Sequence, residues 1–394
     1  MQGSPAPVDK RVTLANWEDP PFSRWAFSHV RELIPTARIG RGEGPVTPLE
    51  RDERDLRGIS FEHRGKRYTV GEMLDATSTD SLLVLKDRRI VTEWYDEGID
   101  AATTHLLMSV SKSLTSALTG VMVDRGSIAP EAEVPTYVEE LRGTSFEGCT
   151  VQHLLDMRAG TRWSEDYEDP ASDAHLYEEV MGWRPRDPSR DLPDNLYDYM
   201  AGLHDNVRPH GGPFDYRSIL TNVLGWVLER AGGATFAELF SREIWSQIGA
   251  ERDAEITVDT AGCALEDGGI CTTLRDLARI GQLYLDRGEI GGRRVLPASW
   301  TERPTTPDPE LIEAFTAAPE ARFHPGAMYH DCWWCLDPER GIFTGLGIHG
   351  QQLLVHRPAG VVVAKFSTQP IAYEIGVEQL QIWGSLAICD ALAG

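Results

Sequence analysis

The sequence predicts one antiparallel sheet built from strands near both ends of the chain, covered by helices, with a mostly helical segment inserted between the two groups of strands. Short apolar runs typical of strands occur within residues 81–95 and again within residues 341–366. Between them, apolar residues recur at helical spacing. We therefore expect an α/β domain made of residues 1–130 and 280–394, a mostly helical domain of residues 131–279, and an active site between the two.

Each predicted element rests on a local pattern. The runs 81–86 and 89–95 flank Asp87-Arg88 and predict a hairpin. Near the other end, three runs predict an antiparallel meander at residues 341–347, 351–356 and 360–366. A helix is expected over residues 374–392, and the middle of the chain is expected to hold helices at residues 150–157, 220–231, 236–248 and 273–285.

A lysine three residues after a serine is the most informative local feature. Of the 38 basic residues only five are lysines, and one of them ends the stretch Ser109-Val-Ser-Lys112. A guanidinium cannot lose its proton in a protein, whereas a lysine amine can. In a chain that otherwise uses arginine, a lysine is therefore expected where the amine must lose its proton. The pair therefore suggests a nucleophile, Ser109, with Lys112 as its general base.

The residues after Ser109 predict a helix that begins at the serine. Apolar residues at 114, 117, 118, 121 and 122 share one face, and Gly126 offers a C-terminal end. In the first helical turn, residues three apart face each other, and backbone N–H groups can stabilise an oxyanion. The alternative is an N-capping serine followed by a solvated lysine. Ser111 is a rival nucleophile, but it is expected to point about 100° around the helix from Lys112.

Length, composition and charge bound the class of protein. A chain of 394 residues with 41% apolar residues can form one large domain or two. Residues 1–19 are polar and no later run has membrane-spanning length, so we expect a cytoplasmic protein that does not enter a membrane. The net charge of -23 argues against nucleic acid and anionic membranes as partners and is compatible with small cationic substrates.

Two sequence patterns are expected to carry no function. Six scattered cysteines suit reduced thiols, and the lone Cys332-Trp-Trp-Cys335 has no second pair to complete a metal site. Residues 345–350 match G-x-G-x-x-G, but they lie between predicted strands, whereas a dinucleotide site requires a helix after the glycines. We therefore expect no metal and no cofactor.

Two further groups would complete a serine acylation site. Tyr216 stands just before the helix predicted from residue 220, and a tyrosine whose pKa is lowered by nearby cations can pass a proton to a leaving group. Its alternative role is to anchor a loop. An oxyanion hole needs a second backbone N–H, and the glycine-rich strand at 345–351 can approach the serine closely because glycines lack side-chain bulk.

These residues resemble those of a known family. Ser109-x-x-Lys112, Tyr216-x-Ser218 and a late His349-Gly-Gln351 are similar to the serine β-lactamase and penicillin-binding superfamily, nearest the class C β-lactamases and the carboxylesterases related to them. Longer stretches resemble the 6-aminohexanoate-dimer hydrolases, which degrade nylon oligomers, at residues 17–27, 105–113, 165–172 and 347–351. The resemblance covers nearly the whole chain and implies a β-lactamase-like fold.

The resemblance also implies a role for each matching residue. Ser109 would be the nucleophile, Lys112 its base, and Tyr216 the proton shuttle to the leaving group. The backbone amides of Ser109 and Ile348 would form the oxyanion hole, unless the register of that strand favours a residue nearer Gln351. Tyr167 matches a loop tyrosine that closes over the substrate in the family.

Two substrate-binding positions depart from the nylon-active pattern. Glu178 stands where an aspartate assists the substrate amine, and Asp267 where an asparagine occurs. Both keep or add a negative charge that can attract an ammonium. The alternative for each is an exposed acid in an acidic protein. The lactamase patterns Tyr-x-Asn and Lys-Thr-Gly are replaced by Tyr216-x-Ser218 and the region around His349, which disfavours lactamase activity.

The sequence thus predicts a serine hydrolase that cleaves small linear amides and esters through an acyl-serine intermediate, like a 6-aminohexanoate-oligomer hydrolase with carboxylesterase activity. One alternative is a carboxylesterase or a D-amino-acid peptidase of the same fold without nylon-oligomer activity. Another is a non-catalytic, penicillin-binding-like module for ligand sensing. The resemblance is also compatible with a homodimer.

Overall fold

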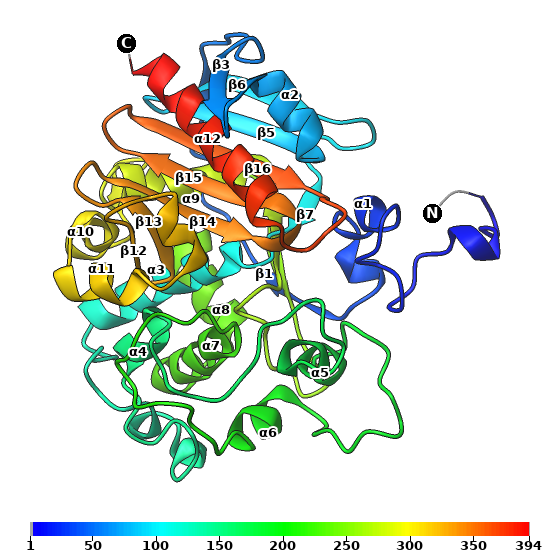
Figure 1. Ribbon diagram of the computed structural model, residues 1–394, viewed down its shortest axis with the longest axis vertical. Coiled ribbons are helices and arrows are strands. Elements are labelled where there is room, and N and C mark those ends of the chain that lie inside the picture. Colours follow the sequence, from blue (N-terminus) through cyan, green and yellow to red (C-terminus); the bar gives the residue numbers. More distant parts are fainter. Residues whose placement is uncertain (1–2, 394) are drawn as a thin grey trace.

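The larger of two main sheets joins strands from both ends of the chain, as predicted (Figure 1). In the computed structural model, which describes residues 3–393, its strands follow the order β12-β13-β14-β15-β16-β5-β6-β2. All neighbours are antiparallel except β2 and β6, which are parallel. The strands are β2 (Glu50–Arg51), β5 (Thr79–Lys86), β6 (Arg89–Tyr95), β12 (Met328–His330), β13 (Trp333–Asp337), β14 (Ile342–Gly347), β15 (Gln351–His356) and β16 (Val361–Ser367).

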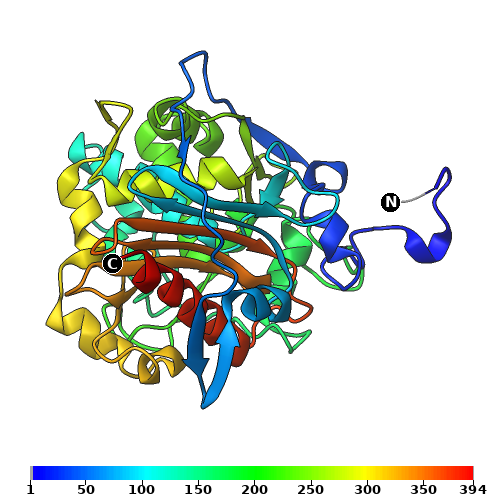
Figure 2. The same cartoon turned by 90° about the horizontal axis from the view of Figure 1, so that it is seen from above.

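Alternate side chains of the central strand β5 pack on opposite faces of this sheet. Leu83 and Leu85 face the core that contains α9 (Leu274–Leu285), whereas Leu82 and Val84 face α2 (Val70–Ala76) and α12 (Ile375–Leu392). This is the two-residue period of a strand buried on both sides. Figure 2 shows α12, in red, lying along one face of the sheet. The predicted hairpin, meander and final helix are all confirmed.

A second, four-stranded antiparallel sheet was not predicted. Its strands follow the order β1-β8-β9-β7, and they are β1 (Thr36–Ile39), β7 (Thr104–Leu106), β8 (Ala254–Thr257) and β9 (Ile270–Thr273). β8 and β9 are buried throughout and have only four residues each, too few for the two-residue period of a strand to stand out. They come from the segment expected to be mostly helical. The domain boundaries at residues 130 and 279 stay a prediction.

Helices gather in the lower part of the molecule, around the buried α7 (Figure 1). The helices of this region are α4 (Val151–Leu155), α5 (Asp173–Val180), α6 (Leu196–Ala201), α7 (Ile219–Gly232) and α8 (Phe236–Phe240). The helix predicted over residues 236–248 is not a continuous α-helix in the structure. It changes after α8 into a wider turn at Ser241–Trp245, which buries Ile244 and Trp245 together.

The β12–β13 hairpin also escaped prediction. Its turn residues Asp331 and Cys332 both have positive φ, 49° and 61°, a turn geometry that asparagine and glycine usually mark. Cys332 lies in the turn and Cys335 on β13, so the C-x-x-C pattern runs from the hairpin turn into the second strand. All six cysteines are free and buried in the described part of the chain.

The other α-helices and strands include the 15-residue helix α3 and several short elements. They are α1 (Ser23–Ala26), α3 (Val110–Asp124), α10 (Ala298–Glu302), α11 (Pro309–Phe315), β3 (Ser60–His63), β4 (Lys66–Thr69), β10 (Glu289–Ile290) and β11 (Arg293–Arg294). Among the helices of residues 3–393, none combines the length and apolar character needed to span a bilayer.

Gly281 lets α9 pack directly on β16, because a Cβ there would lie 2.4 Å from Val362 Cγ1. We expect Gly281→Ala to lower the free energy of unfolding by about 1–3 kcal/mol, the usual cost of overpacking, despite the better helix propensity of alanine. Gly58→Ala is the control, since a Cβ at Gly58 meets nothing within 4 Å. Denaturant unfolding followed by fluorescence measures both, and equal stability of the two variants would contradict this packing.

Candidate active site

Ser109 lies at a sharp turn between β7 and α3. Met108, immediately before it, is buried and has a φ of 47°, a left-handed conformation that costs a non-glycine residue about 1–3 kcal/mol. Ser109 itself is the N-cap residue of α3, so the predicted helix start is confirmed. This turn puts the serine at the positive end of the helix dipole, where a developing oxyanion is stabilised.

Lys112 lies one turn into α3 and is only 1% exposed. Its Nζ is 2.8 Å from Ser109 Oγ, 2.9 Å from Ser218 Oγ and 2.8 Å from the backbone oxygen of Asp267. Burial lowers the pKa of the Lys112 amine and outweighs the nearby carboxylates of Asp267 and Glu165, which raise it. A neutral amine keeps N–H groups for Ser218 and Asp267 and can present its lone pair to Ser109. The alternative of a solvated lysine is therefore wrong.

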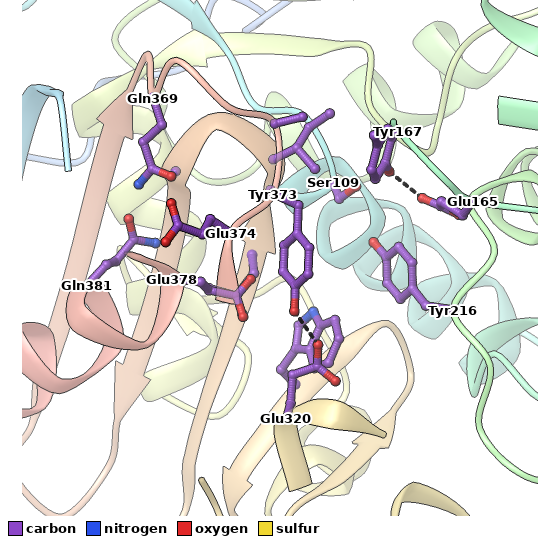
Figure 3. Close-up of a pocket in the computed structure, with 16 residues that line it drawn as sticks. Ser109, Glu165, Tyr167, Tyr216, Glu320, Gln369, Tyr373, Glu374, Glu378 and Gln381 are labelled. Carbon is purple, nitrogen blue, oxygen red and sulfur yellow. Dashed lines mark hydrogen bonds between the residues drawn. The ribbon is translucent and has the colours of Figure 1, made fainter. Parts of the chain in front are cut away.

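Glu165, which the sequence did not mark as a site residue, closes the hydrogen-bond network. Its Oε1 accepts from the Ser218 hydroxyl at 2.6 Å, and its Oε2 accepts from the Ser218 backbone N–H at 2.5 Å. The Tyr167 hydroxyl also donates to Oε1, at 2.5 Å (Figure 3). Because the Ser218 hydroxyl gives its hydrogen to Glu165, its lone pairs remain for the Lys112 N–H. Glu165 thereby sets the direction in which the lysine donates.

Tyr216 packs beside Lys112 and against the aromatic ring of Trp334. Lys112 Nζ is 5.0 Å from the centre of the Tyr216 ring, and the ring of Trp334 stacks on it at 5.6 Å. Burial and the charge of Glu165 raise the pKa of Tyr216 well above its ordinary value, although hydrogen bonding with Ser109 opposes this. The expected lowering of this pKa by cations is therefore wrong. A buried tyrosine of this kind stays neutral and is suited to donate a proton.

The glycine-rich strand β14 reaches the nucleophile. A Cβ on Gly347 would lie 2.7 Å from the backbone oxygen of Leu107 and 3.0 Å from the Ser109 nitrogen, so a glycine permits this close approach. Ile348 follows in a short turn to β15 and lines the cavity beside Ser109. The turn is held by His349, whose Nδ1 is 2.7 Å from the backbone oxygen of Gln369. The oxyanion-hole role of the Ser109 and Ile348 amides stays a prediction.

Ser109 lines two adjoining cavities. Glu165, Tyr167 and Ile348 also line both of them. The first cavity, about 830 Å³ including its open mouth, is bordered by Tyr216 and the ring of Trp334. The second cavity is bordered by both of the acids predicted to bind substrate. Tyr167 borders both cavities (Figure 3), and its role in closing over a substrate stays a prediction.

The two predicted substrate-binding acids differ in their partners. Both are less than a tenth exposed, so the alternative of exposed surface acids is wrong. Glu178 is paired with the Arg184 guanidinium and with His175, whose Nδ1 is 3.2 Å from Glu178 Oε2. Asp267 Oδ1 is buried and has no hydrogen-bond partner among the described residues, and burial raises the pKa of Asp267 to about 6. Asp267 is therefore the one of the two acids with an unpaired carboxylate oxygen, and the role of both acids in substrate binding stays a prediction.

A cluster of possible metal ligands lies outside these cavities, and a nearby arginine already balances its negative charge. Asp156, His330 and Asp331 place ligand atoms within 4.8 Å of one another. The Arg303 guanidinium binds Asp331, and the Gln152 amide donates to Asp156 at 2.9 Å and to Asp331 at 3.1 Å. The arginine supplies the positive charge that a metal would bring. This network joins α4 to the β12–β13 hairpin and has a structural role.

Comparisons with known proteins identify the family. The sequence profile of the β-lactamase family matches residues 69–374. The chain belongs to the β-lactamase family. This β-lactamase-fold hydrolase is 37% identical over 361 residues, 91% of this chain and 88% of the relative, to the 6-aminohexanoate-dimer hydrolase of Paenarthrobacter ureafaciens.

Solved structures of other proteins share the fold. A candidate 6-aminohexanoate-dimer hydrolase from Bacillus anthracis superposes with a TM-score of 0.88 and 30% identity, over 98% of each chain. A family VIII carboxylesterase gives a TM-score of 0.57 at 16% identity, over 80% of this chain and 96% of that one. The predicted resemblance and the predicted β-lactamase-like fold are both confirmed.

We expect Glu165→Gln to lower kcat/KM for an ester substrate about ten- to a hundred-fold, the value of a charge-assisted hydrogen bond. A glutamine can donate to Ser218, whose hydroxyl would then occupy the lysine lone pair that Ser109 needs. Because the Glu165 charge raises the pKa of Lys112, its loss should also move the acid limb of the pH–rate profile to lower pH.

The matched control is Glu168→Gln, which removes an exposed charge three residues away. A merely structural role for Glu165 would lower activity without moving the acid limb. An acid limb that stays in place in Glu165→Gln would therefore contradict the assignment of Glu165 as a positioning residue.

Proposed function

We propose that the protein cleaves linear amides and esters of small molecules through an acyl-serine intermediate on Ser109. The observation that supports this most directly is the 2.8 Å contact between the Ser109 hydroxyl and a buried lysine amine whose pKa is lowered. A serine becomes a nucleophile when an adjacent base can take its proton. Lys112 has both the position and the depressed basicity for that role.

In the acylation step, Lys112 Nζ takes the Ser109 proton as Oγ forms a bond to the substrate carbonyl carbon. The carbonyl electrons move to its oxygen, which the backbone N–H groups of Ser109 and Ile348 stabilise in this proposal. The tetrahedral intermediate then collapses, and the bond to the leaving nitrogen or oxygen breaks.

The leaving group needs a proton, and Tyr216 provides it. The tyrosine is neutral, and the Lys112 ammonium lies 5.0 Å from its ring centre. As Tyr216 gives its proton to the leaving atom, the ammonium replaces it, so that a tyrosinate does not accumulate. Water then attacks the acyl-serine by the reverse proton path and restores Ser109, which gives one acid and one amine or alcohol per water consumed.

We propose 6-aminohexanoate oligomers and related amides and esters as the substrate class. Two observations support this: the relatives described above carry that name, and Asp267 offers an unpaired carboxylate oxygen in the second cavity for a substrate amine. A carboxylesterase or D-amino-acid peptidase would use the same chemistry and differ only in substrate. A ligand-sensing module would have no need of the Ser109–Lys112–Ser218–Glu165 network. A cytoplasmic location and a homodimer remain part of the proposal.

We expect wild-type protein to hydrolyse a p-nitrophenyl short-chain ester and the linear 6-aminohexanoate dimer, and to react with a fluorophosphonate probe. Ser109→Ala should abolish both the turnover and the labelling. Ser111→Ala is the matched control, because Ser111 is fully buried and its Oγ accepts from the Ile270 N–H at 3.2 Å. Mass spectrometry of the labelled peptide identifies the modified serine.

Each other outcome of this experiment has a definite meaning. Ester cleavage without dimer cleavage would identify a carboxylesterase of the same fold. Ser109-independent turnover, or labelling of Ser111, would contradict the proposed nucleophile. The absence of any turnover or labelling would favour the ligand-sensing alternative.

A further inference from the structure

The two cavities beside Ser109 suit different ends of a linear substrate. Tyr216 borders the first cavity and does not line the second, whereas Asp267 borders the second and does not line the first. A leaving group that takes its proton from Tyr216 therefore lies in the first cavity, and the acyl chain extends toward Asp267 in the second. This inference rests on the proposed function and takes it further, to the groups that bind the leaving end of the substrate.

Gln369 presents an unpaired amide nitrogen at the first cavity. Its side chain lines the cavity and is 6% exposed, and its Nε2 has no hydrogen-bond partner within residues 3–393. The amide nitrogen lies over Gly350, where a Cβ would come within 2.4 Å of it, so the glycine leaves room for the amide. An amide nitrogen can only donate, so the group that satisfies it must be an acceptor. A bound acceptor recovers the free energy that the unpaired donor costs.

Glu378 supplies a second donor on the same wall. Its Oε1 is buried and has no hydrogen-bond partner among the described residues, which is a costly position for an ionised carboxylate. Burial and the charge of Glu320 raise the pKa of Glu378 to about 8, so the group is largely protonated at neutral pH. A protonated carboxyl group carries an O–H that can donate to a carboxylate.

Gln381 lies on the same wall, with its amide oxygen already occupied. Gln381 is 1% exposed and lines the cavity, and Lys365 Nζ donates to its Oε1 at 2.8 Å. This contact polarises the amide and makes its N–H groups stronger donors. Figure 3 shows Gln369, Glu378 and Gln381 together on the side of the cavity away from Tyr216.

Two other acids line the first cavity and do not occupy these donors. Glu320 accepts the hydrogen of the Tyr373 hydroxyl at 2.6 Å. Glu374 is exposed at the start of α12, where solvent screens its charge. Both acids weaken the attraction of the wall for an anion, but Gln369 Nε2 and Glu378 Oε1 remain unpaired beside them.

We propose that Gln369, Glu378 and Gln381 form a subsite in the first cavity that binds a carboxylate at the end of the leaving group. The carboxylate oxygens accept from Gln369 Nε2, from the Glu378 O–H and from Gln381 Nε2. A 6-aminohexanoate dimer, which has an ammonium at one end and a carboxylate at the other, is then held at both ends with its amide at Ser109. These contacts are remote from the reacting bond and act equally on substrate and transition state, so they lower KM more than they raise kcat.

Three amides with the same 6-aminohexanoyl acyl group test the subsite. Their leaving amines are 6-aminohexanoate, 6-aminohexanamide and 1,6-diaminohexane, which end in a carboxylate, a neutral amide and an ammonium. We expect kcat/KM for the carboxylate-bearing amide to exceed that for each of the others at least about tenfold, the value of one charge-assisted hydrogen bond, with most of the difference in KM. An amide that is cleaved too slowly is compared by its inhibition constant against a p-nitrophenyl ester.

Each variant is assessed by the ratio of kcat/KM for the carboxylate-bearing amide to that for the neutral amide, because this ratio does not depend on the folded fraction. Gln369→Met, which removes the donor at similar size, should lower the ratio at least about fivefold. Glu378→Met should also lower it, whereas Glu378→Gln keeps a neutral donor and should retain it. Gln352→Met is the matched control, since Gln352 is also buried with an unpaired Nε2 but lines neither cavity.

A wild-type ratio at or below one, faster cleavage of the ammonium-bearing amide, or a ratio that Gln369→Met does not alter would overturn the subsite. Glu374→Gln should raise the ratio by removing a like charge, and a lower ratio would contradict the subsite as well. Ser109-dependent hydrolysis of a p-nitrophenyl ester is measured in parallel. If that also fails, the proposed function is wrong, and if it persists, only the subsite is wrong.

Discussion

Removal of the Lys112 amine from water is the physical constraint on which the candidate site depends. A lysine in solvent is protonated at neutral pH and cannot act as a base. At 1% exposure the charged form loses its hydration, and this loss outweighs the nearby carboxylates. Burial destabilises the ammonium form of Lys112 relative to the neutral amine, so the neutral form is easier to reach. The three contacts of Nζ, with Ser109, Ser218 and the Asp267 carbonyl, fix where its lone pair can point.

The fold maintains this burial with segments far apart in the sequence. α3 supplies Ser109 and Lys112, the N-terminus of α7 supplies Ser218, and the loop before α5 supplies Glu165. The β12–β13 hairpin covers Tyr216 with Trp334, and the Arg303 network anchors that hairpin to α4. Gly347 allows β14 to close against the serine. Each of these contacts excludes water from the amine or orients one of its partners.

Part of this arrangement could be predicted from the sequence, because it depends on local spacing. Ser109 and Lys112 are three residues apart on a helix, and the helix start follows from the apolar pattern after them. Glu165 could not be found in this way, since its partner Ser218 lies 53 residues away and no local periodicity relates the two. The direction of the Tyr216 pKa shift was also inaccessible, because it depends on burial by Trp334 and on the charge of Glu165.

The strands that escaped prediction have equally specific causes. β8 and β9 have only four residues each, too few for the two-residue period of a strand to stand out. The β12–β13 turn uses Asp331 and Cys332 at positive φ, without the glycine that usually marks such a turn. By contrast, β5, β6 and the meander were predictable because turn residues bound each apolar run.

The pH dependence of single-turnover acylation by a p-nitrophenyl ester tests the central claim most directly. Only the neutral form of Lys112 can take the Ser109 proton, so the rate should be full above the lowered lysine pKa and fall as the pH drops through it. We predict an acid limb below the ordinary lysine value of about 10.4 that persists, moved to lower pH, in Asp267→Asn. A rate that stays flat down to pH 5, or an acid limb that vanishes in Asp267→Asn, would contradict Lys112 as the base.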